Sequence, residues 1–342
     1  MVNGKKKMVI SSVITLFSFM LILMAVFQGH GQEIFQTVQS IPVWSFFVLL
    51  LLSICCSMIE ATAGWLALRT QLPQITFWQS LEVSFLNIFG NVATLGAGTV
   101  PLQSLYLYYL GMIPGAGAGL VTMCYTIQKA TVLLYCTVML LWQRHWLYRS
   151  DMRLSRYILI GYSVCALIIC ALLLICTWGK VQELTLWVIG KLPGTGKWPV
   201  RKKVWRENVE SLRTYSKALL SNQMCCWCMV GIYAAKLCLL YAIPYLCTKI
   251  LGLDQLSFWQ VQLLSAVMVL ITSAMPNVGG VGPAEFTFAL LYSPYLGTVN
   301  ASTAMVLYRT ASYFVPFLMS IPSALHLKAL VLKKATSREQ EI

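Results

Sequence analysis

The stretch AMPNVGGVGPAEFTFAL, residues 274–290, decides the fold, because glycines, two prolines and one carboxylate interrupt an otherwise apolar run. Proline lacks an amide donor and glycine enters positive φ readily, so this backbone does not stay helical. Unpaired peptide groups in hydrocarbon are costly, and a break at membrane depth survives only inside protein or beside water. The stretch therefore predicts a broken helix next to a cavity. The alternative is a short turn outside the membrane between two ordinary spans.

The composition indicates a helical membrane protein. Hydrophobic residues make up 58 % of the 342 residues and charged residues only 11 %, and several apolar windows reach the length of about 20 residues that a spanning helix needs. The net charge of +14 is expected to collect in cytoplasmic loops, so we predict no directly bound nucleic acid. The 12 cysteines lie almost wholly in apolar segments and only three histidines are present, which predicts no metal site and no cofactor.

The fold class predicted from these windows is all-α, a polytopic membrane protein that forms one integral membrane domain over residues 1–342. Two segments, 77–110 and 258–291, are each broken by glycine and proline, and they predict re-entrant helical hairpins that enter and leave the membrane on the same side. About six full spans are predicted, at residues 8–27, 42–68, 117–142, 157–178, 218–248 and 301–325.

Basic residues predict the orientation. They are most frequent at Lys5–Lys7, in the loop 180–217 and after Lys328, so these parts and both termini are expected in the cytoplasm of a plasma-membrane protein. The loop 144–156 carries four arginines against this rule, and its side stays open. Arg69 is assigned to the cytoplasmic side. The loop 180–217 has 38 residues, too few for a soluble catalytic domain.

The order span, hairpin, span occurs twice, over 42–142 and over 218–325, with opposite orientation in the membrane. This pattern predicts an inverted repeat, in which broken helices meet near the midplane and allow alternating access. The alternative is a chance similarity between two glycine-rich turns. Each predicted hairpin tip carries asparagine, then glycines, then proline: Asn91, Gly96, Gly98 and Pro101 in the first, and Asn277, Gly279, Gly280, Gly282 and Pro283 in the second.

Two motifs carry a resemblance to a known family: PNVGGVGPAE at 276–285 and LYRTASYFVP at 307–316. With them, nearly the whole chain resembles the transmembrane region of lysylphosphatidylglycerol synthases, also called the multiple peptide resistance factor family, and related flippase-like proteins. The resemblance implies a domain that moves aminoacylated phosphatidylglycerol, or a related polar lipid, from the inner to the outer leaflet. Full-length members add a cytosolic domain that transfers lysine from lysyl-tRNA, and no segment here fits it. The segment 101–104, Pro-Leu-Gln-Ser, departs from the acid and base expected there, which leaves the headgroup open.

Six charged residues fall within predicted membrane segments, where an unpaired charge costs about 2.5 to 3.5 kcal/mol on insertion scales. They must pair with one another or face water. We predict that they bind a lipid headgroup, with lysine and arginine on the phosphate and a glutamate on a cationic group such as lysyl. The alternative is that all are structural pairs. The six are Lys129, Lys236, Arg309, Glu60, Glu82 and Glu285, and within this set Lys129 and Arg309 are the expected phosphate ligands, with Glu285 or Glu60 as the partner of a cationic headgroup.

Three functions are compatible with these features. The leading hypothesis is a flippase-like lipid transporter, with an anionic or aminoacylated membrane phospholipid as its partner. The alternative is the membrane part of a phosphatidylglycerol lysyltransferase that acts with a separately encoded catalytic subunit. The third is a scaffold or a small-solute permease. A homo-oligomer is a further partner hypothesis, and no catalytic residue is predicted because no nucleophile lies near a suitable base.

Overall fold

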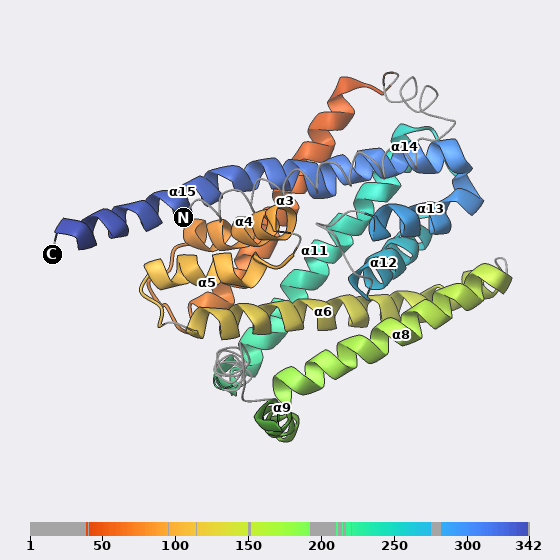
Figure 1. The fold of residues 1–342 in the computed structure, drawn as a ribbon. Coiled ribbons are helices and arrows are strands. Elements are labelled where there is room, and N and C mark those ends of the chain that lie inside the picture. The colour runs from red at the N-terminus through yellow and green to blue at the C-terminus, as the bar shows by residue number, and fades with distance from the viewer. Residues whose placement is uncertain are drawn as a thin grey trace.

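A computed structural model describes residues 41–94, 96–113, 115–149, 152–191, 221–274 and 282–340, together with positions 39, 210, 214 and 217–219. These residues form an all-helical bundle (Figure 1). The predicted span 8–27, most of the loop 192–220 and the second hairpin tip at 275–281 lie outside the described residues. So do the predicted tip residues Asn277, Gly279 and Gly280.

The helices at the predicted spans and hairpins follow the predicted order, and two more, α7 and α9, lie in segments predicted as loops. Over the described residues they are α3 (Val43–Leu68), α4 (Phe77–Ala93), α5 (Thr99–Tyr109), α6 (Ala116–Trp142), α7 (Arg144–Arg149), α8 (Met152–Thr177), α9 (Gly179–Lys191), α11 (Gln223–Ile250), α12 (Phe258–Ala274), α13 (Pro283–Leu296), α14 (Thr298–Arg309), the π-helical turn η1 (Thr310–Phe314) and α15 (Val315–Gln340).

Four of these segments are long and apolar enough to cross a membrane, which confirms a membrane protein. They correspond to the predicted spans 42–68, 117–142, 218–248 and 301–325. The fifth predicted span in the described part, 157–178, is helical as α8, but its strongly apolar portion, Ile158–Ala171, is shorter than the other four. The four are Val43–Leu68, Ala116–Trp142, Gln223–Ile250 and Thr298–Lys334, the last made of α14, η1 and α15.

The first predicted hairpin is a pair of helices, α4 and α5, that lie side by side and are joined by a short turn (Figure 1). Thr76 begins α4 with a capping box, and a positive φ of 88° at Gly96 turns the chain between the helices. The amide of the buried Gln103 in α5 donates to the Val83 carbonyl in α4 at 3.0 Å. The two helices are thus fixed to each other at the tip and near the middle.

Gly90 permits the closest approach between α4 and α5. A Cβ placed there would lie 2.9 Å from the Gly98 carbonyl and the Thr99 Cα, which are backbone atoms that side-chain motion cannot move away. We therefore expect Gly90→Ala to lower the free energy of unfolding by about 1 to 3 kcal/mol. The matched control is Gly231→Ala in α11, where a Cβ meets open space and helix propensity adds up to about 1 kcal/mol. Equal thermal midpoints for the two purified variants in detergent would contradict this account.

The last helix is longer than predicted. Residues 328–342 were predicted to be a short tail after the last span, whereas α15 continues through them without interruption to Gln340. Leu327 is buried and Leu330 and Val331 pack against the same apolar cluster, so an apolar face at helical spacing extends past the predicted end. In Figure 1, α15 runs along one side of the bundle with α4 against it.

The described residues form two large apolar clusters and a small third one around Ala61, Leu81 and Phe85. Of the two large clusters, one contains residues of α6, α8, α11, α12, α13 and α14, and the second contains residues of α3, α4, α5, α6, α11 and α15. Helix α11 packs along α3 and also contacts α6, α12 and α14, so it runs through the middle of the bundle. Side chains from both clusters, such as Val121 and Met268, line the cavity described next.

Candidate functional site

A cavity of about 610 Å³ lies within the bundle, which is in the range typical of small-ligand sites. Its wall includes residues from α3, α4, α5, α6, α11, α12, α13, α14, η1 and α15. Four of the six predicted charged residues line it: Glu60, Lys129, Lys236 and Arg309. Amides and hydroxyls complete the polar wall, among them Asn87, Asn91, Gln103, Gln128, Ser273 and Ser312.

The turn between α4 and α5 forms part of the cavity wall. Of the predicted first-tip residues, Asn91 and Gly96 line the cavity, whereas Gly98 and Pro101 lie beside it in the turn and the first turn of α5. The Gly96 amide donates to the Asn91 carbonyl at 2.9 Å, so the polar groups of this non-helical backbone are partly satisfied within the turn.

The second break flanks the same cavity. Thr272 and Ser273, near the end of α12, and Ala284, in the first turn of α13, all line it. Of the predicted second-tip residues in the described part, Gly282 precedes α13 with a φ of 102°, and Pro283 is its first residue. Proline suits this position because the first helical amides have no partner within the helix.

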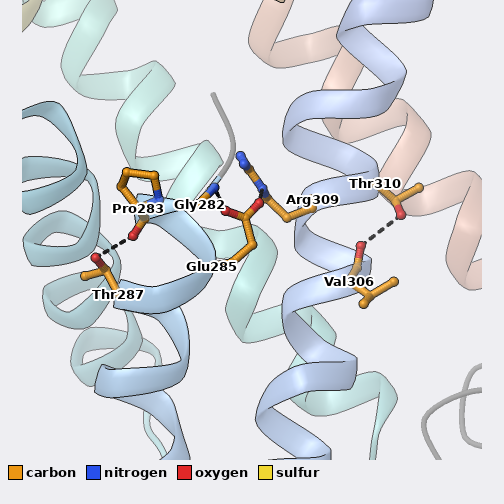
Figure 2. A network of polar contacts seen from close by, with 7 residues as sticks. All are labelled: Gly282, Pro283, Glu285, Thr287, Val306, Arg309 and Thr310. Carbon is orange, nitrogen blue, oxygen red and sulfur yellow. Dashed lines mark hydrogen bonds and ion pairs between the residues drawn. The ribbon is translucent and has the colours of Figure 1, made fainter. Parts of the chain in front are cut away.

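Glu285 and Arg309 form a buried ion pair between α13 and α14 (Figure 2). Arg309 Nε donates to Glu285 Oε1 at 2.5 Å, and the Gly282 amide donates to Glu285 Oε2 at 2.6 Å. The Glu285 side chain is only 2 % exposed, so both of its oxygens are bound by protein and it sits behind the cavity wall. A carboxylate in the first turn of α13 also interacts favourably with the helix dipole.

The Arg309 guanidinium extends toward the cavity and lies 4.7 Å from the centre of the Tyr313 ring, within cation–π range. Tyr313 belongs to η1, where the Val315 amide donates to the Thr310 carbonyl five residues earlier. Such π-helical turns are frequent at functional sites because they change which side chains face the interior. Here the turn places Ser312 and Tyr313 on the cavity wall.

Glu60 and Lys236 form a second ion pair, between α3 and α11. Lys236 Nζ lies 2.8 Å from Glu60 Oε2, and Gln128 Nε2 in α6 donates to Glu60 Oε1 at 3.4 Å. The Lys236 side chain is 11 % exposed and the Glu60 side chain 17 % exposed. Both line the cavity, whereas Glu285 does not. This pair is therefore accessible to a ligand in the cavity.

Lys129 has no carboxylate within ion-pair distance among the described residues. Its Nζ donates to Ser273 Oγ at 2.8 Å and lies 5.1 Å from the centre of the Tyr125 ring. With Lys236 and Arg309 matched by Glu60 and Glu285, the charge of Lys129 is the unbalanced one in this set. An uncompensated cation in a partly buried polar cavity favours an anionic ligand, and a phosphate is one that lysine commonly binds.

Glu82 lies apart from the other five charged residues. It accepts a hydrogen bond from the Tyr106 hydroxyl, and its carboxylate lies 3.0 Å from His326 Nδ1. These contacts join α4 to α5 and α15, and Glu82 does not line the cavity. The structure thus brings together Glu60, Lys129, Lys236, Arg309 and, behind the wall, Glu285.

Sequence reasoning did not identify two neighbours of the charged groups. Tyr125 stands four residues before Lys129, a spacing that places both on one helix face, so this contact could have been inferred. Ser273 comes from a helix 144 residues further along the chain, and no local pattern links it to Lys129. The π-helical turn has one signal, Pro316, which cannot donate the helical hydrogen bond to Ser312.

Comparison with protein families assigns residues 8–320 to the one described as the lysylphosphatidylglycerol synthase TM region. A comparison with curated proteins found no match. The matched region contains all of the residues that line the cavity and every charged residue of the site. It ends at Ser320, within α15. The chain therefore belongs to the lysylphosphatidylglycerol synthase transmembrane-region family.

Proposed function

We propose that this protein is a flippase that moves aminoacylated phosphatidylglycerol, or a related polar lipid, between the membrane leaflets. The headgroup enters the cavity while the acyl chains stay in the surrounding lipid. The observation that carries the proposal is a cavity of about 610 Å³ with three cationic side chains and one carboxylate on its wall, inside a bundle of membrane-spanning helices. Charged groups at such a depth mark substrate pathways because they are costly to keep there.

The headgroup contacts follow from the charges. Lys129, which has no carboxylate partner among the described residues, takes the lipid phosphate, with Arg309 nearby on the same wall. Glu60, the carboxylate that lines the cavity, takes the ammonium of an aminoacyl group. The family name supports lysylphosphatidylglycerol as the substrate, because that lipid carries both a phosphate and a lysyl ammonium.

Alternating access is supported by the order of the helices. Helices α3, α4–α5 and α6 are followed later by α11, α12–α13 and α14–α15, which is the order expected of an inverted repeat with two re-entrant hairpins. Polar contacts join the two units across the cavity: Glu60 to Lys236 and Lys129 to Ser273. We infer that the units move relative to each other as these contacts break and form, so that the cavity opens to one leaflet at a time.

Reconstituted vesicles test the proposal. Fluorescent phosphatidylglycerol and lysylphosphatidylglycerol are placed in both leaflets, and an impermeant quencher is added outside. With the protein present, we expect the protected inner-leaflet fraction to be quenched over time, whereas protein-free vesicles keep a plateau. A diacylglycerol with the same label, which has no phosphate, gives the rate at which a lipid without a charged headgroup changes leaflet. Equal plateaus with and without the protein would show that it does not move these lipids.

The family name is also compatible with the second hypothesis, that the chain is the membrane part of a lysyltransferase. The two hypotheses differ in what the purified chain does with charged tRNA. We expect no transfer of labelled lysine from lysyl-tRNA to phosphatidylglycerol by this chain alone. Transfer by the chain alone, or vesicles without lipid movement that gain lysine transfer when a separate catalytic subunit is added, favours the lysyltransferase role.

A further inference from the structure

The charged groups at the main cavity do not balance one another. Its wall and the side chains directly behind it carry three cations and two carboxylates: Lys129, Lys236, Arg309, Glu60 and Glu285. These five residues, the cavity charge set, have one positive charge in excess. The excess lies at Lys129, since the other two cations are each paired with a carboxylate.

The surroundings of the cavity supply no charge that removes this excess. In the described part of the chain no further carboxylate lines the cavity, and Glu82 contacts Tyr106 and His326 instead. Residues 275–281, with the sequence Met-Pro-Asn-Val-Gly-Gly-Val, contain no ionisable side chain. The positive charge is therefore left for a ligand or a solvent ion to balance.

Both carboxylates of the cavity charge set already have partners. Glu60 accepts Lys236 Nζ on Oε2 at 2.8 Å and Gln128 Nε2 on Oε1 at 3.4 Å. Glu285 accepts Arg309 on one oxygen and a backbone amide on the other. A carboxylate has sites for further donors, so one ammonium can share Glu60 with Lys236. A second ammonium finds no carboxylate on the wall formed by the described residues.

The uncharged part of the wall suits hydroxyl groups. Asn87 and Asn91, both on α4, line the cavity, and their side-chain amides form no hydrogen bond with another described residue. A side-chain amide offers donors and acceptors, and so does a hydroxyl group. The free hydroxyls of a glycerol headgroup therefore match this part of the wall and add no charge.

We propose that the cavity selects its lipid by headgroup charge, and that a phosphoglycerol headgroup, with one net negative charge, binds better than the same headgroup carrying a lysyl group. The phosphate balances the excess charge at Lys129 and leaves both ion pairs of the cavity charge set intact. A lysyl group brings two ammonium groups, so the lipid becomes a net cation and the positive excess in the cavity grows. This inference rests on the proposed function and narrows its substrate to an anionic phospholipid.

The cost of unbalanced charge decides between the two headgroups. Charges interact more strongly in a partly buried cavity than in bulk water, because the effective dielectric constant is lower. Like charges brought together at a binding site suppress the wrong partner. We therefore expect an affinity at least about tenfold higher for phosphatidylglycerol than for lysylphosphatidylglycerol, with lipids of no net charge between them.

The test compares four lipids that share acyl chains, label and phosphoglycerol. They are phosphatidylglycerol, alanylphosphatidylglycerol, lysylphosphatidylglycerol and lysylphosphatidylglycerol acetylated on its ε-amine. Fluorescence anisotropy of the label measures their binding to the full, unaltered chain in uncharged detergent micelles. We expect phosphatidylglycerol to bind most tightly, the alanyl and acetyl-lysyl lipids less tightly, and the lysyl lipid most weakly. The acetylated lipid is the size control, because it is larger than the lysyl lipid but has one ammonium fewer.

A salt series separates the cavity from the outer surface of this basic protein, since its net charge of +14 also repels cationic lipids. In about 1 M salt the Debye length falls to about 3 Å, which screens exposed charges, whereas partly buried charges are screened much less. We expect the order of the four affinities to persist at this salt concentration.

A carboxylate added to the wall should weaken the preference. Asn87→Asp is expected to balance the excess charge and to shift the ratio of the two affinities by about tenfold in favour of lysylphosphatidylglycerol. The matched control is Asn222→Asp, the same chemical change at an exposed position outside the cavity. Asn222 caps α11 by accepting the Cys225 amide, which an aspartate also accepts, so the control should leave the ratio unchanged.

Four results would overturn the charge selection. They are lysylphosphatidylglycerol binding as tightly as phosphatidylglycerol, an acetylated lipid that binds no better than the lysyl lipid, an order that disappears in high salt, and an unchanged ratio in folded Asn87→Asp. The second would indicate exclusion by size, and the third an effect of the outer surface. Failure of the proposed function gives a different result: the lipids bind in the expected order in micelles, but none moves between the leaflets of reconstituted vesicles. If none of the four binds, both proposals are wrong.

Discussion

Replacing Lys129 by methionine is expected to reduce lipid movement in reconstituted vesicles by about 10- to 100-fold. Hydrogen bonds to charged groups contribute about 1.5 to 3 kcal/mol, and about 1.4 kcal/mol corresponds to a factor of ten. Methionine keeps the length and apolar character of the side chain and removes the charge that has no carboxylate partner among the described residues. The rate of quenching of inner-leaflet fluorescent phosphatidylglycerol measures the effect directly.

Three further variants show whether the charge of Lys129 or its position is responsible. Lys129→Arg keeps the charge and is expected to retain most of the rate. Ser273→Ala removes only the neutral partner at 2.8 Å and is expected to change the rate by less than about tenfold. Lys249→Met, at an exposed ion pair outside the cavity, is the matched control and should be neutral. A Lys129→Met protein that moves lipid at the normal rate would exclude Lys129 as a phosphate ligand.

The long spans were predictable because their signal is local and strong. Residues 42–68 and 117–142 coincide with α3 and α6 to within one residue, since each is a long apolar window. Such a helix begins and ends where its own apolar window begins and ends, so no contact with another part of the chain is needed to place its ends. The first break was predictable for a similar reason, because Gly96 needs a positive φ and the turn around it cannot stay helical.

The pairing of charges could not be predicted, because it depends on which helices become neighbours. Three acids and three bases allow many pairings, and the sequence does not favour Lys236 over Lys129 as the partner of Glu60. The contact between Lys129 and Ser273 joins residues 144 positions apart. Glu82 was grouped with the site because it lies in an apolar helix, yet it faces His326 at 3.0 Å on the side of α4 that packs against α15.

Glycine spacing was also an ambiguous signal. Gly111, Gly115 and Gly119 fall four residues apart, and this spacing predicts a smooth helix face. In the structure Gly111 and Gly115 have φ values of 98° and 86° and belong to the connection between α5 and α6, and only Gly119 lies in the helix. Glycine favours both roles, close helix packing and positive φ, and Pro114 between the first two is the local signal for the second.

Glu285→Gln is expected to lower the free energy of unfolding by about 3 to 5 kcal/mol, because it removes the charge of a buried carboxylate that pairs with the partly buried Arg309. Arg309→Gln should cost a similar amount, since Glu285 is 2 % exposed and the Gly282 amide would be its remaining hydrogen-bond donor among the described residues. Denaturation of the purified variants in mixed micelles, or their thermal midpoints, measures both losses. The exposed pair variant Lys249→Met should change stability by less than about 1 kcal/mol.

The double variant Glu285→Gln/Arg309→Gln distinguishes a mutual pair from two independent contributions. If the ion pair in Figure 2 is the main partner of each residue, two neutral amides can replace it, and the double variant should lose clearly less than the sum of the single losses. Additive losses would mean that Glu285 acts mainly through the Gly282 amide and the start of α13. Transport at a temperature where the double variant stays folded then isolates the role of Arg309 in binding. An unchanged rate would make Arg309 a structural residue, because the phosphate would then be bound without it.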